Sequence, residues 1–254
     1  MSNLPDAIAR WIGGLWAAVG FLTVISVPEQ RAEHGLGGAT LFFPVVGVAL
    51  GICAALIAQV PLSPSLAALL AVAFMWAITG GLHWDGWADV LDAAVTPAMD
   101  PERRLGILSD PRVGAHAAVG VALLALACTS ALMRAPFWGV VLGSAMGRWV
   151  MVATLRWAPA LRSDGAAATL RDGARPAGGA TILLALVLGL ATRGNMALPG
   201  ILIVLGTGAA TATLFALFLV RRLGGMNGDA HGAVGLLTEV VVWAAAAELQ
   251  SVSI

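Results

Sequence analysis

Lysine and tyrosine are absent from this chain of 254 residues, and charged residues of all kinds make up only 11% of it. Without lysine, Schiff-base chemistry is excluded, and every fixed positive charge is an arginine, which is suited to bidentate binding of phosphate or carboxylate. The two cysteines, Cys53 and Cys128, lie in apolar stretches and offer neither a disulfide framework nor a CxxC metal site. The net charge of zero provides no field that attracts nucleic acid, so no nucleic-acid partner is expected.

Hydrophobic residues make up 59% of the chain, and apolar stretches recur at the ~20-residue length that a bilayer requires. They lie near 11–27, 40–60, 66–82, 113–133, 136–155, 178–192, 197–220 and 232–249. In lipid only helices and closed barrels satisfy the backbone, and these stretches do not alternate, so they are expected to be helices. We therefore predict an all-α, polytopic transmembrane helical bundle of about seven or eight segments, with residues 1–254 forming a single integral membrane domain.

The first of these stretches, 11–27, has the apolar core of a signal peptide. A signal peptide begins with a positively charged region, however, and the acidic residue Asp6 does not fit such a region. In addition, no small-residue cleavage site precedes Pro28. Both features favour a retained first membrane segment.

The arginines separate onto alternate connections between the apolar stretches. The connections at 28–39, 83–112, 156–177 and 221–231 hold Arg31, Arg103, Arg104, Arg112, Arg156, Arg162, Arg171, Arg175, Arg221 and Arg222. The connections between them hold only Arg134 and Arg193. By the positive-inside rule the arginine-rich set is cytoplasmic, so we expect a multi-pass protein of a bacterial inner membrane. Every aspartate except Asp6 lies on the same side, which places the active-site loops in the cytoplasm.

The segment from His83 to Asp92 carries three acids where the chain leaves a membrane stretch. Asp85, Asp89 and Asp92 have the spacing i, i+4, i+7 and would lie within roughly 60° of one another on a helix. Stacked carboxylates repel unless a cation lies between them, and Mg²⁺ typically bridges carboxylates to substrate phosphates. The alternative, a solvated helix face, is disfavoured because no basic partner stands at helical spacing. His83 would lie on the opposite side of this helix unless the helix starts at Asp85.

A second candidate region begins at Arg103 and Arg104. Asp110 with Pro111 is either the N-cap and first residue of a helix or part of a functional site. Arg112 would then lie in the first turn, where the helix dipole disfavours a cation. That placement indicates an anionic partner for Arg112, such as a substrate phosphate.

A third candidate is the glycine-rich stretch Gly224–Gly232. Its polar residues are Asn227, Asp229 and His231, and Gly228 lies between the first two. Turns of this kind before a helix expose backbone N–H groups that cradle phosphate, although an ordinary turn is the alternative. The pattern G-G-x-[H/N]-x-D recurs in Gly80–Asp85, so we predict that the two stretches face each other across one cavity, lined by His83 and Asn227.

Two ionisable residues, Arg148 and Glu239, fall within apolar stretches. Intramembrane charge is costly and by default indicates a functional site. The alternative is a structural ion pair that holds two helices together.

Taken together, these stretches resemble the cobalamin synthase family, also called adenosylcobinamide-GDP ribazoletransferases. They follow the family order over nearly the whole chain: Phe21-Leu22-Thr23 with Val27-Pro28, Phe43–Gly47, Gly80–Asp89, Arg103-Arg104-Leu105, Asp110–Gly114, Gly147-Arg148-Trp149, and Asn227–Asp229 through Leu237-Thr238-Glu239. The chain differs from the usual family pattern at three positions: it has Ala93 where Gly is usual, Pro111 where Ser is common and Asn227 where Thr is frequent. None of these differences removes an expected acidic residue.

The resemblance implies a Mg²⁺-dependent enzyme for the last joining step of coenzyme B12 assembly. Adenosylcobinamide-GDP and α-ribazole, or its 5′-phosphate, would give adenosylcobalamin, or its 5′-phosphate, and GMP. The metal ligands would be Asp85 and Asp89, with Asp92 as a third ligand or base and Asp229 completing the metal site, and His83 would be a further catalytic candidate. The groups that bind substrate phosphate would be Arg103, Arg104, Asp110, Arg112, Asn227 and Gly228. The expected partners are these substrates and the lipid bilayer; a homo-oligomer or association with other cobalamin-assembly enzymes stays open.

Two alternatives come from other classes. A CDP-alcohol-type membrane phosphotransferase also carries a D-G-x-x-A element, but Asp89 stands where that family has an arginine. A polytopic transporter would use Arg148 and Glu239 as a site at the membrane midplane, whereas most acids of this chain cluster near one surface.

Overall fold

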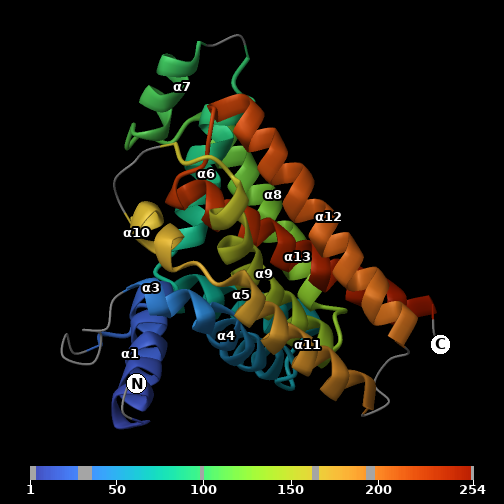
Figure 1. The fold of residues 1–254 in the computed structure, drawn as a ribbon. Helices are drawn as coiled ribbons and strands as arrows, with labels where there is room; N and C mark the ends of the chain where they lie inside the picture. Colours follow the sequence, from blue (N-terminus) through green and yellow to red (C-terminus); the bar gives the residue numbers. More distant parts are fainter. Residues whose placement is uncertain (1–3, 28–35, 98–99, 162–165, 193–197, 253–254) are drawn as a thin grey trace.

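The computed structural model describes residues 4–27, 36–97, 100–161, 166–192 and 198–252, and these residues form helices and no β-strand. Along the chain the helices are α1 (Leu4–Leu22), α3 (Leu36–Ala39), the 3₁₀ turn η1 (Thr40–Phe42), α4 (Phe43–Ala58), α5 (Pro64–Ile78), α6 (Leu82–Val95), α7 (Pro101–Leu108), α8 (Ala115–Leu132), α9 (Phe137–Trp157), α10 (Ala166–Gly173), α11 (Pro176–Thr192), α12 (Leu198–Leu223) and α13 (Gly228–Val252) (Figure 1). The predicted all-α architecture is confirmed. Arg31, Arg162 and Arg193, which contributed to the predicted orientation, lie outside the described residues.

Helix α9 is the centre of the bundle. Its apolar window is 89% buried, whereas the windows of the candidate spans α4, α8 and α12 are 28–44% buried. Helices α4 and α13 both pack against it at very short range. A Cβ built on Gly47 of α4 would lie 2.4 Å from the Ser144 carbonyl oxygen, and one on Gly147 would lie 2.8 Å from that of Gly235. Small residues therefore let these backbones approach closely, as is typical of helix packing in lipid.

Within the part of the chain that the structure describes, five helical segments are long and apolar enough to cross a membrane. They are Thr40–Ala58, Ala115–Leu132, Phe137–Trp157, Leu198–Leu223 and Gly228–Ser251, and α5 with α6 makes a sixth if this bent pair counts as one span. The predicted polytopic bundle is confirmed in this coarser form. The count is below the predicted seven or eight because the stretches near 11–27 and 178–192 contain only the shorter apolar helices Ala9–Leu22 and Pro176–Val187.

The predicted stretch 66–82 does not run straight, because the chain turns a corner after Ile78. Gly80 and Gly81 have φ of +60° and +71°, in the left-handed region that glycine enters without strain. The axes of α5 and α6 consequently meet at 89°. This corner carries the chain from an apolar helix into α6, which bears the acidic residues.

Candidate active site at the crossing of α6 and α13

Helix α6 carries the three acids of the first candidate region. Asp85, Asp89 and Asp92 all fall between Leu82 and Val95, so the prediction that they share one helix is confirmed. Asp85 is exposed, Asp89 is half-buried and Asp92 is buried, so the acids pass from the surface of the protein into its interior. Among the described residues, no arginine forms an ion pair with Asp85 or Asp89.

Asp92 holds the start of another helix. Its Oδ2 accepts a hydrogen bond from the Gly114 backbone N–H at 2.7 Å, and its Oδ1 accepts one from Ala117 at 2.9 Å. These amides belong to the first turn of α8, which begins at Ala115 with Gly114 as its N-cap. A carboxylate at this position satisfies amides without helical partners and complements the helix dipole.

The predicted helix start at Asp110 is therefore wrong. Asp92 supplies from α6 the acceptor that a local N-cap side chain would otherwise supply. Asp110 instead forms an exposed ion pair with Arg112, at 2.6 Å between Oδ2 and Nη2. The Arg112 guanidinium and backbone N–H both donate to the carboxylate and hold the pKa of Asp110 down to about 2. Arg112 precedes the helix instead of lying in its first turn, and the anionic partner that it has in this structure is Asp110.

Arg104 has a structural position that its sequence context did not indicate. It is buried, and its Nη1 donates to the carbonyl oxygens of Ala93 at 2.7 Å and Ala94 at 3.2 Å. Arg222 donates to the same Ala94 oxygen from its Nε at 2.9 Å. The two arginines thus cap the C-terminus of α6, where carbonyls lack helical partners and the dipole is negative. The side chain of Arg103, by contrast, is exposed.

The glycine-rich stretch leads into α13. Asn227 caps this helix: its Oδ1 accepts from the Ala230 N–H at 3.0 Å, and its Nδ2 donates to Asp229 Oδ2 at 2.7 Å. Just before it, the Met226 N–H donates to the Pro159 carbonyl at 2.8 Å, so this amide is used within the chain. A Cβ on Gly225 would lie 2.9 Å from the Leu161 nitrogen, which explains a glycine here by close packing.

Helices α6 and α13 cross in direct contact. A Cβ on Gly86 would lie 2.8 Å from both the Cα and the carbonyl oxygen of Asp229, and one on Gly232 would lie 3.2 Å from the His83 ring. The two stretches with the shared sequence pattern therefore do meet, but as packed helices rather than as loops facing across a cavity. His83 lines a cavity with Asp229, whereas Asn227 is not among the residues that line it.

Negative charge gathers at this crossing. Asp89 lies close enough to Asp85, Asp92 and Asp229 for all three to repel it electrostatically. Among the described residues, no three His, Cys, Asp or Glu side chains converge closely enough to hold a metal ion by themselves. Mg²⁺ commonly takes one or two protein carboxylates and completes its shell with water and substrate phosphate. The carboxylates at the crossing fit that partial kind of site.

The two charges predicted within the membrane stretches form a buried ion pair between α9 and α13. Arg148 donates from Nη1 to Glu239 Oε2, and both side chains are almost fully buried. This contact is the structural arrangement that the sequence left as an alternative. His83 lies next to the pair, since His83, Arg148 and Glu239 line one small cavity.

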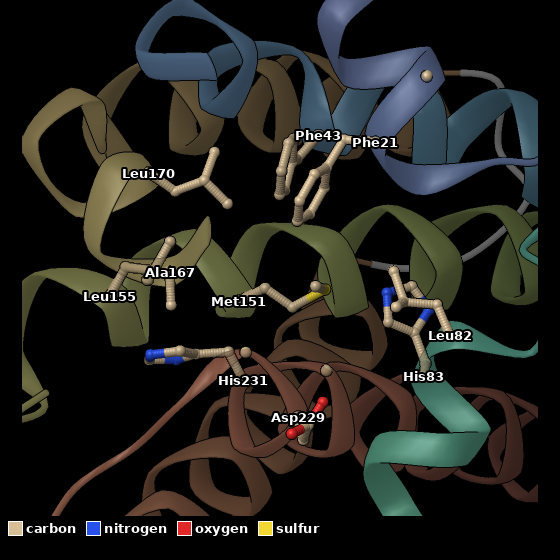
Figure 2. A pocket seen from close by; sticks show the side chains of 13 residues that line it. Phe21, Phe43, Leu82, His83, Met151, Leu155, Ala167, Leu170, Asp229 and His231 are labelled. Carbon is tan, nitrogen blue, oxygen red and sulfur yellow. The ribbon is translucent and has the colours of Figure 1, made fainter. Parts of the chain in front are cut away.

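A larger cavity of about 350 Å³ adjoins the crossing (Figure 2). Asp229 and His231 of α13 and His83 of α6 border it, together with apolar side chains from α1, α4, α9 and α10. Sequence reasoning missed His231 and the pair Phe21 and Phe43. A buried histidine among only four in the chain is a weak signal, and no spacing rule pairs phenylalanines from separate segments.

Comparison with known proteins gives a consistent result. A family model described as cobalamin-5-phosphate synthase matches residues 14–247. The chain is 36% identical over 240 residues to an adenosylcobinamide-GDP ribazoletransferase of Chlorobium phaeobacteroides, covering 91% of this chain and 95% of the relative. Proteins of the same name from Synechococcus sp. and Sinorhizobium medicae are each 34% identical, covering 89% and 91% of this chain and 93% and 94% of theirs. No solved structure matches the chain significantly.

Proposed function

This chain belongs to the cobalamin-5-phosphate synthase family, and we propose that it catalyses the adenosylcobinamide-GDP ribazoletransferase reaction for which its relatives are named. In this reaction a ribose hydroxyl of α-ribazole, or of its 5′-phosphate, attacks the phosphorus next to the cobinamide arm. A new P–O bond forms to the ribose oxygen, the P–O bond to GMP breaks, and the hydroxyl proton is released. Because the chain belongs to this family, the two alternative interpretations of its sequence, a CDP-alcohol-type phosphotransferase and a transporter, are excluded.

The observation that carries the site assignment is the contact between α6 and α13. It brings Asp229 to the helix that bears Asp85 and Asp89, from a position 140 or more residues later in the chain. We propose that Mg²⁺ binds at this crossing through one or two of these three carboxylates and takes its other ligands from substrate phosphate and water. When bound, the metal would neutralise part of the charge on those phosphates.

The remaining polar residues divide into two kinds. Arg103 and Arg112 have exposed guanidinium groups that suit the binding of substrate phosphate. Asp92 and Arg104 are positioning residues, because they bind the ends of α8 and α6. Asn227 holds the first turn of α13 and thereby orients Asp229.

We place the site on the cytoplasmic side of a bacterial inner membrane. The positive-inside rule supports this orientation, since arginines cluster near the site. Arg104 and Arg222 bind the C-terminus of α6, and Arg171 donates to the Ala158 carbonyl from α10, a helix that borders the same cavity as Asp229.

A labelling assay tests the function. Purified protein in lipid nanodiscs receives adenosylcobinamide-GDP and radiolabelled α-ribazole, with Mg²⁺ or with a chelator. We expect the label to enter a corrinoid product with release of an equal amount of GMP, only when both substrates and Mg²⁺ are present. A corrinoid that stays unlabelled under all these conditions would contradict the proposal.

A further inference from the structure

The cavity beside the crossing has mostly apolar walls. They are formed by Phe21, Phe43, Met151, Leu155 and Leu170. The rings of Phe21 and Phe43 stack with their centroids 5.6 Å apart and their planes 17° from parallel, so the wall beside α1 and α4 is aromatic. A volume of about 350 Å³ is near the lower end of the range for small-molecule sites.

One border of this cavity is polar, and the hydrogen bonds around His231 define what it offers to a ligand. The Thr154 hydroxyl oxygen lies 2.9 Å from the carbonyl oxygens of both Val150 and Met151 and 2.8 Å from His231 Nδ1. Either the hydroxyl or the imidazole donates in the contact with Nδ1, depending on the tautomer of His231. In both neutral tautomers Nε2 can form a further hydrogen bond, as an acceptor or as a donor.

The ring nitrogen Nε2 is buried without a partner. His231 Nε2 has no hydrogen bond among the described residues, and His83 Nε2, on the same cavity, has none either. A buried polar atom left without a partner destabilises the folded state. Because Nε2 has almost no accessible surface in this structure, a ligand hydroxyl group at this border of the cavity would reach it through a small movement of the neighbouring side chains.

The volume of the cavity and the polarity of its lining indicate which part of the two substrates can occupy it. A corrin ring with its amide side chains is far too large for this volume. A guanine base carries donors and acceptors along its edge, for which the apolar walls offer no partners. The aromatic base of α-ribazole has a single acceptor nitrogen and an otherwise apolar edge, and its ribose carries hydroxyl groups.

We propose that this cavity is the subsite for the acceptor nucleoside. The aromatic base lies against the wall of Phe21, Phe43 and Leu170, and a ribose hydroxyl forms a hydrogen bond with His231 Nε2. The ribose is thereby placed beside Asp229, next to the carboxylates that face the donor phosphates. This subsite rests on the proposed transfer reaction, and it assigns His231 as a substrate-binding residue.

Filling the cavity provides the first test. Leu170→Trp introduces a bulky ring into the cavity, whereas Leu184→Trp adds the same ring at an exposed position of α11. Isothermal titration of α-ribazole alone, without donor, should show binding to the wild type and to Leu184→Trp. For Leu170→Trp we expect the Kd to rise roughly tenfold or more. The measured KM for adenosylcobinamide-GDP should change by less than about threefold.

His231→Phe supplies a second test that retains the shape of the ring. Loss of Nε2 as a hydrogen-bonding partner should raise the KM for α-ribazole by roughly tenfold and leave the KM for the corrinoid donor nearly unchanged. A thermal melt of each variant in detergent shows that the protein is folded. Any variant whose unfolding midpoint falls far below that of the wild type is replaced by Leu155→Phe, which narrows the same cavity from α9.

The outcomes separate the subsite from the reaction. A rise in the donor KM with an unchanged acceptor KM would assign the cavity to the donor. No change in either KM would indicate that the cavity holds an unrelated occupant, such as a lipid chain. Either of these two results overturns the proposed subsite. The proposed function still stands in both cases, provided that the wild-type protein turns over. Absence of wild-type turnover overturns the function, and the subsite falls with it.

Discussion

Gly86 of α6 lies directly against Asp229 of α13, because a Cβ at position 86 would come within 2.8 Å of the Asp229 backbone. The absence of a side chain at Gly86 is therefore what allows the two helices, and the acids that they carry, to meet. Asp85 and Asp89 flank the contact on either side along α6.

Gly86→Ala should impair the transfer while the protein still inserts in membranes. The added methyl group meets backbone atoms, which cannot rotate away, so α6 and α13 must separate. Overpacking of this kind costs ~1–3 kcal/mol, and misplacement of reacting groups lowers rates by up to roughly 10²-fold. The measurement is kcat in nanodiscs. Gly106→Ala in α7, where no atom lies within 4 Å of the added Cβ, is the matched control and should retain full activity.

Asp92→Asn should lower stability. An amide keeps the volume, but its NH₂ group faces an N–H where the carboxylate accepted a hydrogen bond, so one cap of α8 is lost at a cost of ~1–2 kcal/mol. A lower thermal midpoint in detergent is the expected result. If the variant instead keeps its midpoint and requires more Mg²⁺, Asp92 acts as a metal ligand, and the positioning role is wrong.

The pair formed by Arg148 and Glu239 predicts a non-additive double-mutant cycle. Arg148→Met and Glu239→Leu each leave one charge buried without its partner, which typically costs ~3–5 kcal/mol. The double variant removes both charges and should unfold at a higher temperature than the less stable single variant. Thermal midpoints and yields of the three proteins measure this coupling, and strictly additive losses would show that the pair is not coupled.

Topology is open to cysteine labelling. In a background with Cys53 and Cys128 replaced by alanine, a cysteine at Asp172 in α10 should resist an impermeant thiol reagent added from the periplasmic side. A cysteine at Ser63, exposed between α4 and α5, should react. The reverse pattern would place the crossing of α6 and α13 on the periplasmic side.

Local spacing was sufficient to predict part of this site. Asp85, Asp89 and Asp92 share α6 because their spacing matches the helical period. This feature depends on residues within a few positions of one another. It could therefore be derived without knowledge of the fold.

The remaining features depend on contacts between distant segments. Asp110 and Pro111 have the local pattern of a helix start, but Asp92 caps α8 from 22 positions before Gly114. From the sequence alone, Arg104 resembles a solvated arginine that binds phosphate. Only the fold brings the unpaired carbonyl groups at the end of α6 to its side chain. Such tertiary capping overrides local preference and leaves no periodic pattern in the sequence.

The most direct test of the central claim compares Asp89→Asn with Asp100→Asn in the labelling assay across a range of Mg²⁺ concentrations. Asp89 stands among the carboxylates at the crossing, whereas the exposed Asp100 caps α7 and can be replaced in that role by asparagine. We predict that Asp89→Asn lowers kcat by roughly 10²-fold or more at every Mg²⁺ concentration, while Asp100→Asn behaves as the wild type. Wild-type, Mg²⁺-dependent turnover by Asp89→Asn would contradict the assignment of the crossing of α6 and α13 as the active site.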